Sequence, residues 1–213
     1  MSELRITEIF YSLQGESRTI GVPTVFVRLT GCPLRCSYCD TAYAFSGGKK
    51  FSIDEVLAQV DHFNAGYVTI TGGEPLAQGA SLTLMSRLAD KGYKVSLETS
   101  GALDVSAVDP RVVMVMDLKT PASNEVHRNR YRNIEHLSKQ DQVKFVIAGP
   151  EDYQWSKSIL ARYDLPNRCE VLFSPCMGRQ NPTRLAEQIL QDHLPVRFQM
   201  QLHKLLWGDS PGK

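Results

Sequence analysis

Short apolar runs alternate along this chain with longer stretches in which apolar residues recur at helical spacing. The apolar runs predict strands at residues 6–12, 24–29, 67–71, 94–98, 112–117, 142–147, 171–173 and 196–200. The helical spacing predicts helices at about residues 52–64, 80–91, 151–163 and 182–193. Ser52 and Glu55 form the signature of a capping box at the first helix. Residues 13–16 and 47–50 are predicted as turns.

This order of elements indicates βα units and a parallel sheet. A Rossmann sheet would carry G-x-G-x-x-G in its first turn after a strand, and the sequence lacks this motif there. Polar residues instead follow several successive strands, as they do in α/β barrels. A full barrel needs about 250 residues, whereas this chain has 213. We predict an α/β fold, an incomplete TIM-type barrel of parallel strands with outer helices, in a single domain over residues 1–213.

The composition is that of a globular protein, with 42% hydrophobic and 22% charged residues. A formal net charge of +1 gives no basic excess, so we expect no nucleic-acid partner. The apolar stretches are of strand length and the start lacks a signal peptide, so we expect neither a membrane span nor export. Five cysteines, three of them clustered, favour a metal site in the reducing cytoplasm over a disulfide framework.

The clustered cysteines, Cys32, Cys36 and Cys39, follow the predicted strand at 24–29 with the spacing CX3CX2C. Thiolates are soft ligands that suit iron–sulfur clusters, zinc and copper(I). Structural sites are normally closed by four ligands, whereas three local ligands leave one position open, as a catalytic metal requires. The spacing therefore favours a catalytic metal centre at the carboxyl end of a strand, where α/β barrels place their chemistry.

Other interpretations fit the same cysteines. They could form a zinc knuckle with a remote fourth ligand, or they could be three reduced structural cysteines. A further alternative is an iron–sulfur electron carrier in which Cys176 supplies the fourth ligand. We favour a buried or pocket-lining position for Cys176 over a ligand role.

Polar residues follow four later strands. Gly72, Gly73 and Glu74 end the strand at 67–71, where the two glycines allow close approach of a ligand and Glu74 offers an acceptor for an ammonium group. The alternative is a plain strand-to-helix turn. Two interpretations fit the charged residues Asp117, Lys119 and Lys144. They form surface ion pairs of little energetic value, or they belong to a ring that faces one pocket and binds a charged substrate.

Arg28 lies within the apolar run at 24–29. An unpaired buried charge is costly, so a buried guanidinium needs a carboxylate or a phosphate. That partner is either a bound ligand or a structural glutamate such as Glu8 or Glu16. A third possibility is a side chain that extends to solvent. The pattern favours neither the binding nor the structural role.

The cysteine spacing resembles the signature of the radical S-adenosylmethionine (SAM) superfamily, including the aromatic Tyr38 directly before the third cysteine. The resemblance implies a partial barrel and a [4Fe-4S] cluster on Cys32, Cys36 and Cys39, with one iron left for SAM. It also implies that the Gly72–Pro75 segment receives the SAM amino group. A glycyl-radical activase shares the spacing, but it acts on a protein and would not need a polar ring.

Over nearly its whole length the chain resembles the family of 7-carboxy-7-deazaguanine synthases. The shared segments are residues 13–16, Arg28, 32–41, 72–75, 98–101, 142–144, 174–175 and 201–204. The resemblance implies conversion of 6-carboxy-5,6,7,8-tetrahydropterin to 7-carboxy-7-deazaguanine with loss of ammonia, a step toward queuosine. It also implies a requirement for Mg2+, a reducing partner such as flavodoxin, and a homodimer.

The same resemblance assigns the site residues, and Arg28 is expected to pair with the substrate carboxylate. The pterin substrate is expected to contact Leu13, Gln14, Gly15, Glu16, Arg28 and Thr99. SAM is expected to contact Tyr38, Gly72, Gly73, Glu74, Gly101, Gln142, Val143, Lys144, Ser174, Pro175, Cys176 and Met177. Mg2+ is expected at Thr41. In some members of the family the C-terminus touches the substrate, so residues 211–213 are candidates for the pocket.

Overall fold

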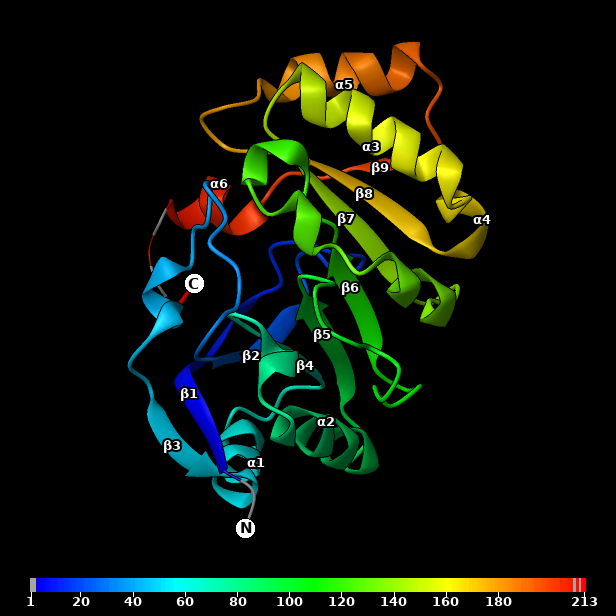
Figure 1. Ribbon diagram of the computed structural model, residues 1–213. Coiled ribbons are helices and arrows are strands. Elements are labelled where there is room, and N and C mark those ends of the chain that lie inside the picture. Colours follow the sequence, from blue (N-terminus) through cyan, green and yellow to red (C-terminus); the bar gives the residue numbers. More distant parts are fainter. Residues whose placement is uncertain (1–2, 209, 211) are drawn as a thin grey trace.

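The computed structural model describes residues 3–208, 210 and 212–213, and in this part of the chain nine strands form one sheet (Figure 1). Their order is β3-β1-β2-β4-β5-β6-β7-β8-β9. The strands are β1 (Glu3–Leu13), β2 (Pro23–Leu29), β3 (Lys49–Ser52), β4 (Tyr67–Gly72), β5 (Lys94–Thr99), β6 (Val113–Asp117), β7 (Gln142–Ile147), β8 (Glu170–Pro175) and β9 (Arg197–Phe198).

The sheet is parallel from β2 through to β9, while β1 pairs antiparallel with both β2 and β3. It does not close, because β3 and β9 lie at opposite edges. Its parallel strands all end at the same edge of the sheet. The predicted α/β fold, an incomplete barrel, is confirmed.

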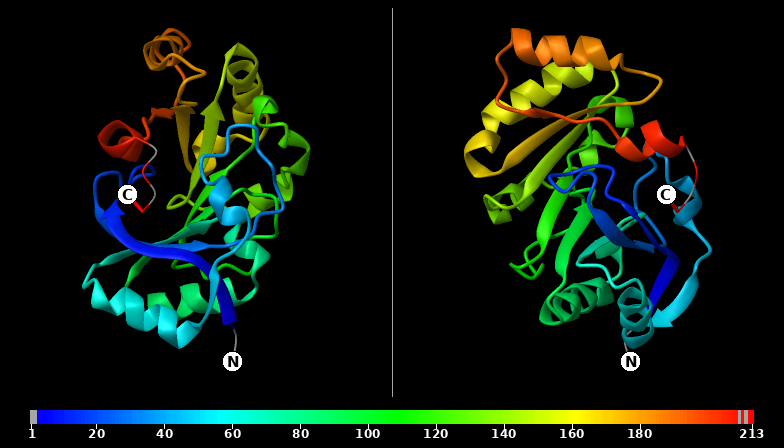
Figure 2. Two further views of the ribbon diagram at one scale, coloured as in Figure 1. Left: turned by 90° about the vertical axis from the view of Figure 1, so that its left-hand side faces the viewer. Right: turned by 180° about the vertical axis from the view of Figure 1, so that it is seen from behind.

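The helices are α1 (Ile53–His62), α2 (Ala80–Asp90), α3 (Pro150–Arg162), α4 (Leu165–Arg168), α5 (Pro182–Gln191) and α6 (Leu202–Trp207). The longer helices α1, α2, α3 and α5 cover the outer face of the curved sheet, whereas α6 packs against the turn after β1 (Figures 1 and 2). The predicted capping box is present, since the Ser52 hydroxyl accepts from the Glu55 N–H at 3.2 Å and the Glu55 carboxylate accepts from the Ser52 N–H at 2.7 Å. No helix in the described ranges is long and apolar enough to cross a membrane.

Strands and helices do not alternate in the middle of the chain, where the sequence also predicts no helix. Between β5 and β7 the described connections contain no α-helix, and three short 3-10 turns lie at Pro121–Ser123, Val126–Arg128 and Tyr131–His136. Asn, Ser and Asp side chains in this region bond to nearby backbone groups and so compete with helix formation. The residues of β3 were predicted as part of a turn, and the predicted strand at 196–200 shortens to β9.

The alternation of side chains along β2 explains how an arginine sits in an apolar strand. Val25, Val27 and Leu29 are fully buried and pack in one hydrophobic cluster with α1 and α2. Phe26 and Arg28 point to the opposite, inner face, because successive side chains of a strand alternate. A second cluster forms between β6–β8 and helices α3 and α5. The two clusters build the outer wall and leave the inner face for polar residues.

Candidate active site

The carboxyl ends of the strands surround a cavity of about 490 Å3. Most of the residues assigned to substrate or cofactors from the sequence line it. They are Leu13, Gln14, Gly15, Glu16, Arg28, Cys32, Cys36, Tyr38, Cys39, Thr41, Gly72, Gly73, Thr99, Lys144, Cys176 and Met177. The structure therefore brings the cysteine loop and the predicted substrate residues to one place.

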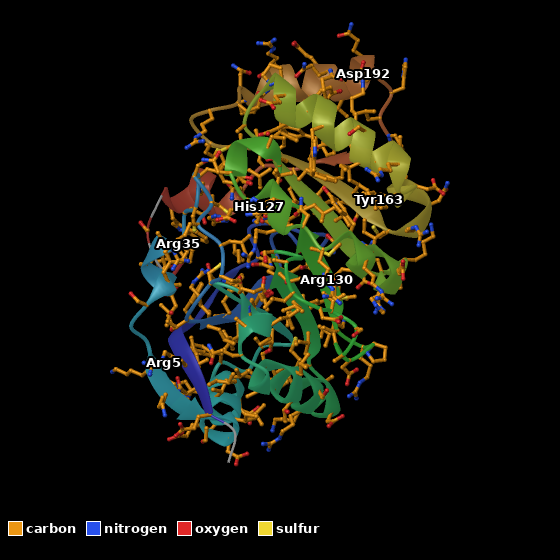
Figure 3. The ribbon with its side chains drawn as sticks, in the orientation of Figure 1. Arg5, Arg35, His127, Arg130, Tyr163 and Asp192 are labelled. Carbon is orange, nitrogen blue, oxygen red and sulfur yellow. The ribbon has the colours of Figure 1, made fainter. Side chains whose placement is uncertain are left out.

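The cysteine loop is held to the segment that follows β6. The Ser37 N–H donates to the Ser123 carbonyl at 3.0 Å, and its hydroxyl donates to the Ala122 carbonyl at 2.6 Å. The Arg35 N–H donates to the Glu125 carboxylate at 2.6 Å. Figure 3 labels Arg35 on this loop and His127 on the adjoining segment. The helix-free connection after β6 thus serves as a support for the metal-binding loop.

The three clustered cysteines are suited to an iron–sulfur cluster. All three are half-buried and line the cavity together. Burial raises the pKa of Cys36 to about 11 and also raises that of Cys32, so these thiols become ligands by losing a proton to a metal. Three neighbouring thiols are soft donors of the kind that hold iron–sulfur clusters.

Gly73 lies in direct contact with the cysteine loop. Its N–H donates to the Leu29 carbonyl at 3.0 Å, and the next N–H, of Glu74, donates to the Gly31 carbonyl at 2.8 Å. A Cβ atom at Gly73 would lie 2.1 Å from the Gly31 oxygen and 3.0 Å from Cys32 Cβ. The glycine is therefore required by close backbone packing beside the first cysteine.

Gly73→Ala is expected to displace the cysteine loop and to cost about 2 kcal/mol of stability, as overpacking does. The loss is expected in the melting temperature and in the iron bound after reconstitution. Gly79→Ala is the matched control, because a Cβ there meets open space. A Gly73→Ala protein that melts and binds iron like the control would contradict this packing argument.

Glu74 is absent from the cavity lining, and its role as an acceptor for an ammonium group stays a prediction. Its carboxylate is fully buried and accepts from the Leu76 N–H at 3.0 Å, the Thr99 hydroxyl at 2.9 Å and the Ser100 N–H at 2.7 Å. These bonds tie the end of β4 to the end of β5. The backbones of Gly72 and Gly73 remain as the parts of this segment that border the cavity.

Arg28 has the structural partner that the sequence left open, a glutamate of β1. Its Nε lies 2.7 Å from Glu8 Oε1, which also accepts from the Tyr43 hydroxyl at 2.8 Å. Its Nη1 and Nη2 donate to no protein group in the described part of the chain. The side chain is 15% exposed and lines the cavity. One side of the guanidinium is fixed while the other remains available for an anion.

The predicted ring of charged residues faces the cavity. Lys144 Nζ contacts Glu16 Oε2 at 2.5 Å and Asp117 Oδ2 at 3.3 Å, and Lys119 Nζ lies 3.2 Å from the same Asp117 oxygen. Burial alone would lower the pKa of Lys144, but the carboxylates of Glu16 and Asp117 outweigh it and raise this pKa well above its ordinary value. Lys144 therefore stays charged inside the cavity wall.

Besides Glu74, five further residues assigned to SAM from the resemblance do not line the cavity, namely Gly101, Gln142, Val143, Ser174 and Pro175. Gln142 and Val143 begin β7, at the end of the strand away from the cavity, and the Gln142 side chain accepts from the Arg18 N–H at 2.7 Å. Gly101 packs on Met116, and Ser174 and Pro175 are buried in β8. Val143 turns to the outer hydrophobic cluster, because successive side chains of a strand alternate between its two faces.

The segment 201–204 closes the cavity over the turn after β1. Gln201 Nε2 donates to Glu16 Oε1 at 2.7 Å, and the Leu202 N–H donates to the Gly15 carbonyl at 2.9 Å. A Cβ atom at Gly15 would lie 2.1 Å from His203 Nδ1. Gly15 is thus needed so that α6 can pack on this turn, and His203 becomes part of the cavity wall.

The C-terminal residues also enter the site. Lys204 Nζ lies 3.1 Å from Asp40 Oδ2, beside the third cysteine. Gly208, Ser210, Gly212 and Lys213 line the cavity. Of the candidates at 211–213, Pro211 lies outside the described residues, as does Asp209.

Several lining residues were absent from the sequence-based assignment. They are Glu98, Ser100, Arg179, Gln201, His203 and Lys204. Glu98 ends a predicted strand, so the strand-end rule could have included it. Arg179 gives no such signal, and its Nη2 donates to the Ser37 carbonyl at 3.0 Å.

Comparison with known proteins agrees with this geometry. Residues 26–144 match the family model of the Radical SAM superfamily, so the chain is a member of that superfamily. It is 44% identical to the 7-carboxy-7-deazaguanine synthase of Chlorobaculum tepidum, over 96% of this chain and 94% of the relative. It is 42% identical to that of Koribacter versatilis, over 96% and 97%. The chain belongs to the family of 7-carboxy-7-deazaguanine synthases.

A solved structure supports the fold independently. The crystal structure of QueE from Escherichia coli superposes with a TM-score of 0.73 at 24% identity, covering 94% of this chain and 95% of that one. Streptococcus suis SuiB bound to S-adenosylmethionine matches with a TM-score of 0.56 over 80% of this chain and 45% of that one, at 14% identity. Both likenesses concern the arrangement of the sheet and its helices.

Proposed function

We propose that this chain converts 6-carboxy-5,6,7,8-tetrahydropterin to 7-carboxy-7-deazaguanine with release of ammonia, in the biosynthesis of queuosine. Membership of the family supports this activity. The observation that carries it is the content of one cavity, where the three-cysteine loop lies together with an arginine whose Nη groups have no protein partner among the described residues. The cysteine loop is suited to a radical-generating cofactor, and the arginine is suited to a substrate carboxylate.

The family implies a [4Fe-4S] cluster and SAM, which when bound supply a 5′-deoxyadenosyl radical by one-electron cleavage of SAM. Cys32, Cys36 and Cys39 would hold the cluster, and SAM would bind beside them. Tyr38 lines the cavity beside them, and its hydroxyl lies 3.2 Å from the Thr120 hydroxyl, which orients the ring for the SAM adenine. The backbones of Gly72 and Gly73 border the position of the SAM amino group.

The chain's part in the reaction is to bind, orient and enclose the substrate. Arg28 grips the substrate carboxylate with its free Nη groups, because a guanidinium matches a carboxylate in a bidentate pair. Gln14, in the turn after β1, and Thr99, at the end of β5, contact the pterin, with Leu13, Gly15 and Glu16 beside Gln14. The segment at 201–204 covers the turn after β1 and limits access of water to the reacting carbon.

We place Mg2+ at Thr41, with the other ligands supplied by oxygen atoms of the substrate and water. Mg2+ takes oxygen ligands, and the Thr41 hydroxyl borders the cavity. The Asp40 carboxylate is less suited, since it accepts from Thr41 at 2.9 Å and pairs with Lys204 at 3.1 Å.

The remaining proposals concern the setting of the enzyme. We place it in the cytoplasm, as a single-domain homodimer that receives electrons from a reducing partner such as flavodoxin. One continuous sheet supports the single domain. Free thiols at all five cysteines support a reducing compartment.

An anaerobic assay tests the activity. Reconstituted enzyme with SAM, dithionite, Mg2+ and 6-carboxytetrahydropterin is expected to form 7-carboxy-7-deazaguanine and ammonia, both measured in the same sample. Formation of 5′-deoxyadenosine without the deazapurine would show that the substrate is wrong. A fully loaded cluster that forms neither product would favour an electron carrier.

A further inference from the structure

Glu98 differs from the other carboxylates of the cavity. Four carboxylate side chains line it, and three of them pair with lysines: Glu16, Asp40 and Asp117. Glu98 makes no ion pair with any described residue, although it lies on the inner face at the end of β5. Its charge acts on nearby Lys144 without forming an ion pair, so its oxygens keep capacity to accept from a ligand.

Neutral groups fix the Glu98 carboxylate in place. Gln14 Nε2 donates to its Oε1 at 3.3 Å, and the Thr71 hydroxyl donates to its Oε2 at 2.7 Å. Gln14 Nε2 is itself positioned by the Thr69 hydroxyl at 3.1 Å. Each carboxylate oxygen retains further acceptor capacity, because an ionised carboxyl group has about four lone-pair sites. Both oxygens are therefore oriented and still able to accept.

The strand register places Glu98 opposite Arg28 on the inner face of the sheet. Arg28 of β2 is the partner of Thr71 of β4, and the residue before Thr71 is the partner of Leu97 of β5. Arg28, Thr71 and Glu98 thus form a row across three adjacent strands. With neighbouring strands about 4.8 Å apart, the Cα atoms of Arg28 and Glu98 are separated by about 10 Å. A flat bicyclic ligand spans such a row end to end.

We propose that Glu98 recognises the pyrimidine edge of the pterin, by accepting from its ring N3–H and its 2-amino group, while Arg28 holds the carboxylate at the other end. This inference rests on the proposed function and adds the residue that selects the 2-amino group. Two parallel N–H donors match a carboxylate in the way a guanidinium does. The arrangement sets the orientation of the ring, and hence which carbon meets the radical.

Calorimetry on the reconstituted enzyme with SAM tests the inference with two stable compounds. They are 6-carboxypterin and 6-carboxypteridin-4-one, which lacks the 2-amino group. Glu98→Gln is expected to weaken binding of 6-carboxypterin by about 10- to 100-fold, the value of hydrogen bonds to a charged group. Its effect on the desamino compound is expected to be several times smaller. Glu187→Gln, an exposed change of the same kind on α5, is expected to leave both affinities unchanged.

Thr71→Val is a second variant that keeps the charge at Glu98 and removes one group that orients it. It is expected to reduce the preference for 6-carboxypterin in the same direction, by several-fold. Equal losses for both compounds in Glu98→Gln would overturn the inference, as would a loss of SAM affinity in place of pterin affinity. If the wild-type enzyme binds neither compound and forms no deazapurine, the proposed function fails and this inference fails with it.

Discussion

Cys36→Ala is expected to abolish both cluster binding and the formation of 5′-deoxyadenosine. Cys36 is the middle ligand of a loop that has three local thiols, so its removal leaves two, too few to hold the cluster. The fold is expected to persist, because the side chain is only half-buried and the loop is anchored through Ser37 and Arg35. Iron and sulfide content, electron paramagnetic resonance and mass spectrometry of the nucleoside product measure the effect.

Two other cysteines provide the controls. Cys169 is buried directly before β8 and does not line the cavity, so Cys169→Ala is expected to retain cluster and activity. Cys176→Ala separates the two iron–sulfur interpretations. Retention of the cluster in this variant agrees with the enzyme, whereas its loss, together with a cluster spectrum that does not respond to SAM, would identify Cys176 as a fourth ligand.

Arg28→Gln is expected to lower kcat/KM by somewhat more than a hundredfold, since truncating one partner of a buried charge pair costs about 3 kcal/mol. The change removes the grip on the substrate carboxylate and also leaves Glu8 without its cation. Arg28→Lys is expected to recover part of the loss. A single ammonium cannot hold Glu8 and present a bidentate fork at the same time. Steady-state kinetics with 6-carboxytetrahydropterin measure both variants.

Tyr43→Phe is the matched control for the structural role of Arg28, which is to hold the Glu8 carboxylate. It removes the other donor to Glu8 Oε1 and leaves Arg28 in place. This variant is expected to lower kcat/KM by no more than about tenfold. That loss corresponds to a hydrogen bond to a charged group at the weak end of the usual range of strengths. If Arg28→Gln and Tyr43→Phe lower kcat/KM equally, Arg28 acts only by holding Glu8.

The sequence predicts the strands and helices wherever the periodic pattern is long. Residues 142–147, for example, form β7 as predicted, and the capping box fixes the start of α1. It fails where short elements depend on partners distant in the chain. The strand at Lys49–Ser52 carries two lysines and exists because it pairs with β1. The connections around β6 carry turn residues, and no local signal shows that they support the cysteine loop.

The site is predictable to the extent that chemistry follows strand ends. The three cysteines, Arg28 and Lys144 line the cavity as the sequence indicated. Glu74 does not, because the groups that surround its carboxylate come from the neighbouring strand β5. The choice between Glu8 and Glu16 as the partner of Arg28 also depends on register, which pairs Glu8 directly with Arg28. Such cross-strand relations are absent from the pattern along one chain.

The packing of α6 on Gly15 has a consequence for how the enzyme is made. Domains begin to fold from the N-terminus during synthesis. Residues 13–16 leave the ribosome long before residues 201–204, so the turn after β1 waits for its cover until the whole sheet has been synthesised. Until then the cavity beside the cysteine loop lacks the wall that Gln201 and His203 form in the finished chain.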